Sequence, residues 1–375
     1  MKALKKKLYR WLLIGVIALV AVRLALPYAV KWYLNNQVLN HMEAYRGHVD
    51  DVDLSLWRGA YTIQGLKIVK IGTRLEAPFV DVEEMDLSVQ WKALFDGAIV
   101  GEVECRHPSV HFAFSDSEEA SQTGTEEDWV EVVKSLMPIR MNRFAMIDGR
   151  VALTNVLAKP STDLPLEGFN LEIRNIQNVA AGKDGALPSS VTASGFAPDY
   201  GGRLSFTADA NLLKNIPDFD YNMRFENVEL TSLNPLAMYY SGMDFEKGIV
   251  SVYSEMAMQD GAFEGYIKPL VRDMRIFGWR EKGRPLGQWF REFFSEGIQE
   301  IFENQKKQQF ATRVPISGEL SKVKTDIWLT IVNAFKNAYI RAFEYKLDQS
   351  IDFEDLQKHP KGQKKNNGEM PGLSP

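Results

Sequence analysis

The histidines and the single cysteine are the side chains of this 375-residue chain best suited to metal binding or nucleophilic chemistry. His107 and His111 are four residues apart, a spacing that on a helix would present two imidazoles to one metal ion. They lie in a stretch where apolar and polar residues alternate, which predicts a strand. On a strand such side chains share a face but lie roughly 13 Å apart. We therefore expect no metal site at this pair.

Cys105 lies in the same alternating stretch, between Gly101 and His107, and we interpret it as a packing residue rather than a nucleophile. Because it is the one cysteine, the chain forms no intrachain disulfide and no cysteine-based zinc cluster. Neighbouring acids are the residues that general acid–base catalysis would use. In segments with a period of two, however, acids are typical of a solvated strand face. We interpret three pairs in this way: Asp50/Asp51, Glu83/Glu84 and Glu126/Glu127.

Sequence signatures of catalysis and nucleotide binding do not occur in the chain. It contains no Gly-x-Gly-x-x-Gly, no Gly-x-x-x-x-Gly-Lys-Ser/Thr and no Gly-x-Ser-x-Gly. The 44 Lys and Arg residues against 49 Asp and Glu give a formal net charge of −5, whereas nucleic-acid binders need basic surface. We therefore predict no enzymatic activity, no cofactor and no nucleic-acid partner.

The elements that would position a site begin with a membrane segment. Residues 1–10 are rich in lysine and arginine, and residues 11–30 form an apolar run of about 30 Å as a helix, the thickness of a bilayer core. Arg23 lies near one end of the run and can snorkel toward the headgroups. The aromatic rings of Trp11, Tyr28 and Trp32 lie where rings favour the interface. These four residues are the predicted membrane anchor.

The basic N-terminus also predicts the orientation of this segment. Under the positive-inside rule, residues 1–10 lie in the cytoplasm and the remainder outside it, so the chain is expected to be a single-pass protein of the inner (cytoplasmic) membrane with a periplasmic body. The alternative is a cleaved signal peptide. Residues 22–29 offer a poor cleavage site with Arg23 and Pro27 close by, which favours an uncleaved signal anchor.

Residues 31–46 keep a helical apolar spacing, which predicts a helical extension ended by Gly47. From there residues 47–286 show the period of two of consecutive antiparallel strands, with expected turns at Asp96-Gly97, Pro108, Asp148-Gly149 and Gln259–Gly261. Residues 115–128 form an acidic loop without apolar periodicity, which we interpret as a flexible excursion.

Helical periodicity returns in the last third of the chain. Residues 287–347 contain two predicted amphipathic helices, Trp289–Phe302 and Thr325–Leu347, around a strand at 313–320. Short helices are expected at Trp129–Met137 and Pro235–Tyr240, and the polar residues 348–375 predict a disordered tail. The fold class is therefore α+β, mainly β: a transmembrane helix, a curled and largely antiparallel sheet, and C-terminal helices. About thirteen strands at ~4.8 Å would give a sheet roughly 60 Å wide.

The order of several short motifs resembles AsmA-like proteins of the bacterial envelope. Most similar is an uncharacterised AsmA-related domain family. The motifs that carry the resemblance follow the N-terminal anchor in this order: Val52–Leu56, Gly65–Ile68, Pro138–Leu153, Leu233–Tyr240, Gly242–Gly248, Asp260–Gly265, Pro315–Leu320 and the helix around Asn333-Ala-Phe. The resemblance covers most of residues 1–347 and adds no catalytic motif.

The resemblance implies a role in outer-membrane biogenesis and lipid movement along an AsmA-like β-sheet groove. This chain is much shorter than the members of the family thought to bridge two membranes. The expected partners are the inner membrane, phospholipid and other envelope proteins. The expected lipid-facing groove consists of the inward apolar residues Leu54, Leu56, Ile63, Ile68, Val82, Leu87, Val89, Val110 and Phe112. An alternative is a scaffold of an envelope complex, in which the sheet closes into a dry core. The sequence does not choose between an open groove and a closed core.

Overall fold

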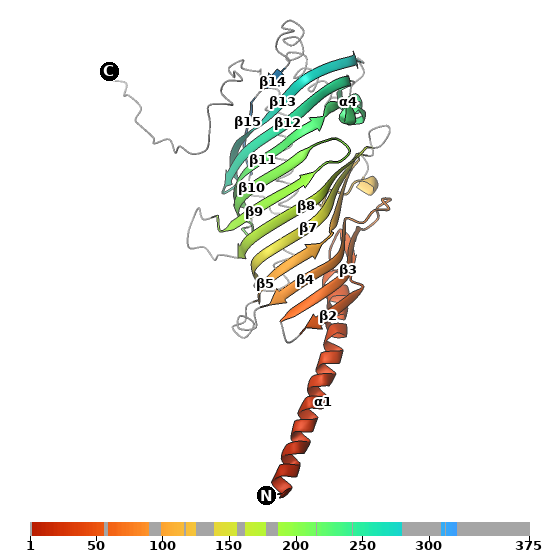
Figure 1. The fold of residues 1–375 in the computed structure, drawn as a ribbon, viewed down its shortest axis with the longest axis vertical. Helices are drawn as coiled ribbons and strands as arrows, with labels where there is room; N and C mark the ends of the chain where they lie inside the picture. Colours follow the sequence, from red (N-terminus) through yellow and green to blue (C-terminus); the bar gives the residue numbers. More distant parts are fainter. Residues whose placement is uncertain are drawn as a thin grey trace, which may run out of the picture.

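The computed structural model describes residues 2–55, 59–89, 99–115, 118–124, 139–155, 162–177, 187–214, 216–241, 243–279, 309–311 and 313–320. Within them, one long N-terminal helix precedes a large mixed sheet of fifteen strands (Figure 1). The predicted class, α+β and mainly β, is confirmed. Three predicted helices, Trp129–Met137, Trp289–Phe302 and Thr325–Leu347, and the predicted tail 348–375 lie outside the described residues.

Helix α1 covers Lys2–Tyr33 and continues as one turn of π-helix, η1, over Leu34–Val38. The prediction of a helix to residue 46, ended by Gly47, is wrong. The chain folds back after Val38, and the Gly47 amide donates to the Leu39 carbonyl at 3.0 Å from within the first strand. A Cβ on Gly47 would lie 2.9 Å from the Leu39 side chain, so this glycine permits the fold-back rather than capping a helix.

The strands are named in chain order, and in the sheet they run from the end of α1 to the far end of the molecule (Figure 1). They are β1 Tyr45–His48, β2 Asp51–Ser55, β3 Ala60–Lys70, β4 Val80–Val89, β5 Ile99–Arg106, β6 Ser109–Phe114, β7 Ile139–Asn155, β8 Thr162–Gln177, β9 Ser189–Phe196, β10 Arg203–Asn211, β11 Asp218–Glu229, β12 Met243–Gln259, β13 Ala262–Trp279, β14 Gln309–Ala311 and β15 Val314–Glu319. Short helices are η2 Glu118–Ala120, η3 Leu230–Leu233 and α4 Asn234–Ser241, the last confirming the helix predicted at 235–240.

The sheet is antiparallel except at its centre, where β5 and β6 both run parallel to β7. Two expected turns are therefore wrong. Pro108 separates β5 from β6, but the chain keeps its direction there, and Asp148-Gly149 lies inside the single 17-residue strand β7. The expected turn before β13 is confirmed, because Gln259 pairs with Ala262 across a two-residue connection. β14 and β15 pair with β13, so the sheet continues past the predicted body boundary at residue 286.

Left-handed backbone conformations recur within or beside several strands. Residues with positive φ include Gly65 in β3, His107 between β5 and β6, Asp148 in β7, Gly168 in β8, Asn227 in β11, Gly248 in β12 and Asp273 in β13. The pairing register shifts or is interrupted beside these residues, as expected for β-bulges. Bulges bend a strand and increase its twist, which accounts for the curl of the sheet in Figure 1. Asp-Gly reads as a turn in sequence because both positions tolerate positive φ.

Part of the acidic segment is packed on the sheet. Ala113 and Gln122 exchange two backbone hydrogen bonds of 2.8 Å, and Gln122 is fully buried. β6 pairs with β4 at Ser109 and Val110, and Gln122 takes the same side of β6 further along the strand, at Ala113. Residues 118–124 are therefore a docked segment, contrary to the flexible loop expected over 115–128. The prediction failed because it relied on the lack of apolar residues in the segment. The segment is held mainly by backbone and amide hydrogen bonds, which need no apolar face.

Candidate functional site

One face of the sheet is apolar along its whole described width. Alternating side chains on β2–β15 point to this face, and most of their direct cross-strand partners are also apolar: Val52 faces Ile63, Met146 faces Leu171, and Phe206 faces Met223. The buried residues form clusters along it, from Val52, Ile63 and Ile68 beside α1 to Met256, Phe263 and Ile316 at the far end. We call this surface the apolar face.

The residues predicted to line a groove lie on this face where the structure describes them. Ile63 and Ile68 are buried in the cluster beside α1, with Leu54, Leu87, Val110 and Phe112 packed against it. Val82 is buried in the neighbouring cluster with Val103 and Cys105. Val89 is in β4, but its side chain and the whole of Leu56 lie outside the described residues.

The cluster beside α1 is built around three aromatic rings. Tyr45 is fully buried, and its ring centroid lies 5.0 Å from that of Phe79, which in turn meets Phe112 edge-on at 5.6 Å. The Tyr45 hydroxyl accepts a 3.2 Å hydrogen bond from the amide of Gly124 in the docked acidic segment. A buried tyrosine needs such a partner for its polar end, so the segment and the cluster stabilise each other.

The end of the N-terminal helix is part of the same cluster. Leu39 is buried in it, and Val30 and Leu34 pack against it. The Asn35 side chain makes two hydrogen bonds with the backbone of Val49: its Nδ2 donates to the carbonyl at 3.1 Å, and its Oδ1 accepts from the amide at 2.8 Å. The Asn35 amide thus takes the place that a neighbouring strand would have beside Val49. These two hydrogen bonds join the helix to the sheet in addition to the covalent chain.

Most of α1 lies clear of the sheet (Figure 1). The segment Arg10–Val38 is long and apolar enough to cross a membrane, and its most apolar window has no buried residues. The predicted anchor residues all lie on α1, and Trp11, Tyr28 and Trp32 are 71%, 75% and 58% exposed. Arg23 lies on the side of the helix that faces β2, across a small cavity. The N-terminal helix is therefore a candidate membrane span joined directly to the apolar face.

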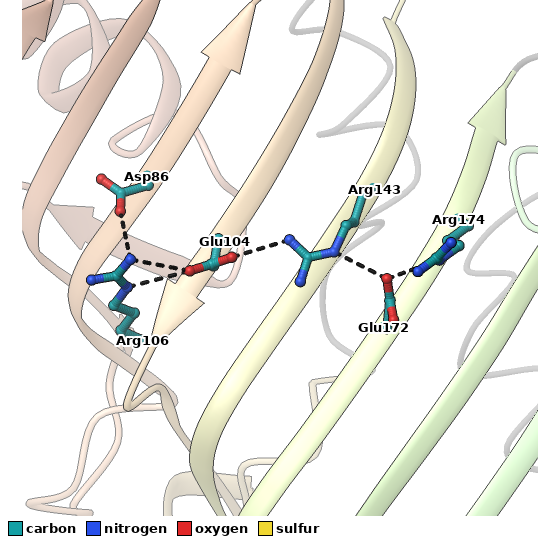
Figure 2. Close-up of polar contacts among 6 residues, drawn as sticks. All are labelled: Asp86, Glu104, Arg106, Arg143, Glu172 and Arg174. Atoms are coloured by element: carbon teal, nitrogen blue, oxygen red, sulfur yellow. Dashed lines mark hydrogen bonds and ion pairs between the residues drawn. The ribbon is translucent and has the colours of Figure 1, made fainter.

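The opposite face of the sheet is polar and carries a row of alternating charges, which we call the ionic ladder. Figure 2 shows it crossing β4, β5, β7 and β8 through Asp86, Arg106, Glu104, Arg143, Glu172 and Arg174. Arg143 is its centre, with contacts of 3.0 Å to Glu104 and 3.0 Å to Glu172. Every charge in the row has an opposite neighbour, so the ladder fixes strand register rather than presenting free charge to a ligand.

The ladder shifts the pKa values of its own members. The hydrogen bond from Arg143 is the main cause that lowers the pKa of Glu104, and hydrogen bonds from Arg174 and then Arg143 lower the pKa of Glu172. The same contacts, with Glu104 first, raise the pKa of Arg143. These shifts keep the carboxylates charged, which is the state a structural ion pair requires.

The residues considered for chemistry are dispersed. His107 is exposed between Glu83 and Asp148, at 4.0 and 3.8 Å, whereas the His111 Nε2 hydrogen-bonds the Thr154 hydroxyl at 2.7 Å. Among the described residues, no group of three His, Cys, Asp or Glu side chains is placed to hold a metal ion. Of the acid pairs, Glu84 pairs with Arg106 at 3.5 Å, Asp50 lies near His48, and Glu126/Glu127 are outside the described residues.

Burial determines the state of Cys105. Its side chain is 3% exposed within the cluster of Val82 and Val103, and burial, followed by the charge of Glu104, raises its pKa to about 12. A thiol with this pKa stays protonated at neutral pH, so it packs as a small apolar residue.

No family model and no curated protein matches this chain. The AsmA-like resemblance therefore stays a prediction. The structure adds three features that sequence reasoning missed: the ionic ladder, the docking of residues 118–124, and the two-sided bond of Asn35. Only the ladder could have been suspected from the sequence, because its glutamates and arginines occupy the polar positions of strands in which polar and apolar residues alternate.

Proposed function

We propose that this chain is a membrane-anchored envelope protein that binds lipid acyl chains on the apolar face of its sheet. The helix α1 would hold it in the inner membrane with residues 1–10 in the cytoplasm and the sheet in the periplasm. The proposal assigns it no enzymatic activity and no cofactor. Its role would be in maintenance of the cell envelope, in contact with phospholipid.

One observation carries this proposal: the apolar face begins in a cluster that the end of a candidate membrane span helps to build. An acyl chain leaving the bilayer beside α1 would meet Val52 and Leu54 first, and would then find apolar residues on each successive strand. The twelve strands of the main path are separated by eleven spacings of ~4.8 Å, which extend this face by roughly 50 Å. Removing acyl chains from water gives the binding energy, at about 0.8 kcal/mol per buried CH₂.

A scaffold with a closed core is the second candidate, and burial favours it. Val52 and Phe79 are only 3% and 6% exposed, as in a dry protein interior. On this reading the apolar face is a core, and the protein acts by holding other envelope proteins together.

Site-specific photocrosslinking distinguishes the two. Ala193 points to the apolar face, opposite Leu171 and Phe206, whereas the adjacent Thr192 is exposed on the polar face. A photoreactive amino acid at position 193 of the full-length chain in bacterial membranes should attach lipid, identified by mass spectrometry of the purified adduct. The same amino acid at position 192 should not. Absence of lipid at 193, or equal labelling at both positions, would refute lipid binding, and protein adducts alone would favour the scaffold.

A further inference from the structure

A half-open cavity of about 260 Å³ lies between the second half of α1 and the edge strand β2. Its two walls come from segments that are close in sequence but of different character. The helix wall consists of Arg23, Leu24, Pro27, Tyr28 and Lys31, and the strand wall consists of Asp51, Val52, Asp53 and Leu54. The cavity is therefore positively charged on one side, negatively charged on the other, and apolar between them.

The charges of the two walls are not joined to each other. Within the described residues, Arg23, Asp51 and Asp53 form no ion pair, and Lys31 donates a hydrogen bond to the backbone carbonyl of Asp50. Opposite charges that face each other across a gap gain little of the attraction that contact would give. A ligand with an anionic and a cationic group would complete both sets of interactions at once.

The position of the cavity indicates which ligand is available. Lys31 follows the predicted span directly, and Arg23 lies eight residues earlier, about 12 Å along the helix axis. Strand β2 pairs with β3 alone among the described strands, and an open strand edge does not lie in hydrocarbon. The cavity therefore lies at the outer end of the predicted span and opens toward the lipid headgroups, to which Arg23 can snorkel and where exposed rings such as Tyr28 are favoured.

From this arrangement we infer that the cavity binds the headgroup of a zwitterionic phospholipid that carries a primary amine. Arg23 and Lys31 bind the phosphate, for which guanidinium and ammonium groups are the usual protein ligands. Asp51 and Asp53 bind the ammonium group and repel headgroups that carry only negative charge. The volume suits a headgroup rather than a whole lipid, because pockets for drug-sized ligands span about 300–1,000 Å³.

The strand wall also connects the cavity to the apolar face. Val52 and Leu54 line the cavity and belong to, or pack against, the cluster beside α1. A lipid held by its headgroup here would have its acyl chains next to the first residues of that face. That the bound molecule is a lipid rests on the proposed function.

The test uses the full-length chain in nanodiscs that contain equal amounts of phosphatidylethanolamine and phosphatidylglycerol, with bound lipid identified by native mass spectrometry. The unmodified chain should retain phosphatidylethanolamine about tenfold over phosphatidylglycerol. Substituting Arg23→Gln and Lys31→Gln together should reduce retained lipid about tenfold, because one to two charge-assisted bonds are lost. Asp51→Asn with Asp53→Asn should instead bring the ratio of the two lipids close to one.

Matched variants separate charge at the cavity from charge in general. Lys67 is exposed on the other face of β3 and pairs with Asp81, so Lys67→Gln should change neither amount nor ratio. Two single variants test whether the chain is folded. Arg23→Gln removes the charge and should lose lipid, whereas Arg23→Lys keeps the charge and should retain most of it; a chain that failed to fold would lose lipid in both. Equal effects of Lys67→Gln and the cavity variants, or an unchanged ratio in the aspartate variant, would overturn the inference.

Two further outcomes are decisive. Saturation by soluble phosphorylethanolamine in detergent, with no preference for lipid in nanodiscs, would assign the cavity to a free phosphate compound and overturn the lipid assignment. If lipid adducts form at position 193 but no headgroup selectivity is found, the proposed function stands and the cavity assignment is refuted. Selectivity without adducts at 193 would support the cavity and refute the apolar face as the acyl site.

Discussion

The reactivity of Cys105 offers a sharp test of which face of the sheet is buried. The side chain lies on the apolar face between Met85 of β4 and Met146 of β7, its cross-strand neighbours. Burial raises its pKa from an ordinary 9.0 to about 12. At about pH 8, the thiolate fraction falls from about one tenth to about one in ten thousand.

The expected rate follows from two opposing effects. The thiolate population falls about a thousandfold, but a thiolate of higher pKa is more nucleophilic, by roughly 20-fold over three units at a Brønsted slope of about 0.45. The net reduction is about 50-fold before occlusion is considered. Because Cys105 is only 3% exposed, access through local opening should slow alkylation further.

The assay is the rate of reaction with an aromatic disulfide reagent at about pH 8, followed by absorbance and confirmed by intact mass. The matched control carries Cys105→Ala and Thr192→Cys, which moves the only thiol to the exposed face. The folded protein should react at least about 30-fold more slowly than this control, and both should react alike in concentrated guanidinium chloride. A folded rate within threefold of the control would refute the assignment of Cys105 to a buried face.

Three other predictions concern stability, measured by thermal unfolding in mild detergent. Arg143→Gln should cost about 1–2 kcal/mol at neutral pH, because two ion pairs are lost. The pKa values of Glu104 and Glu172 are lowered in the folded state, so their contribution is full above their ordinary value and is lost as pH falls from there through the lowered folded-state pKa; the cost of the substitution should shrink over that range. Asn35→Ala should cost about 1–3 kcal/mol, because it leaves the backbone amide and carbonyl of the buried Val49 without their partner. Asp148→Val should cost about 1–3 kcal/mol, because a β-branched residue is strained at φ 51°.

Each of these has a control of the same chemistry. Arg203→Gln removes an arginine that forms no ion pair with another described residue, and Asn36→Ala removes a hydrogen bond on an exposed part of the helix end. Asp209→Val changes an exposed residue in the regular strand β10. These variants should lower the midpoint by no more than a degree or two, and comparable losses in a variant and its control would contradict the corresponding argument.

The sequence predicted the faces of the strands well where the period of two was unbroken. Ile63, Val82 and Phe112 were expected on one side, and that is where they lie, because alternation of side chains is a property of each strand by itself. The turns predicted at Pro108 and Asp148-Gly149 were wrong, because the residue types that favour a turn also occur at bulges and at junctions between strands. Only a neighbouring strand in register distinguishes these cases.

The helix junction shows the same limit. The apolar spacing from Tyr33 to Tyr45 suits a helix, but Leu39 and Tyr45 are buried by the fold-back that places them against the first strands. Nothing in the sequence marks Asn35 as structurally important, because its hydrogen bonds depend on where the fold places Val49, fourteen residues later. A polar side chain in a predicted helix gives no sign of which backbone it will meet.

By itself, the sequence determined that this protein has an apolar N-terminal helix, a body of alternating strands and a low net charge, since these depend on composition and short-range period. The tertiary structure alone decided that β5 and β6 run parallel to β7, that residues 118–124 dock on β6, and that six charges form one ladder across four strands. It also decided that Arg23 and Asp53 face one cavity. These are contacts between residues far apart in the chain, and local periodicity fixes which way a side chain points but not what it meets.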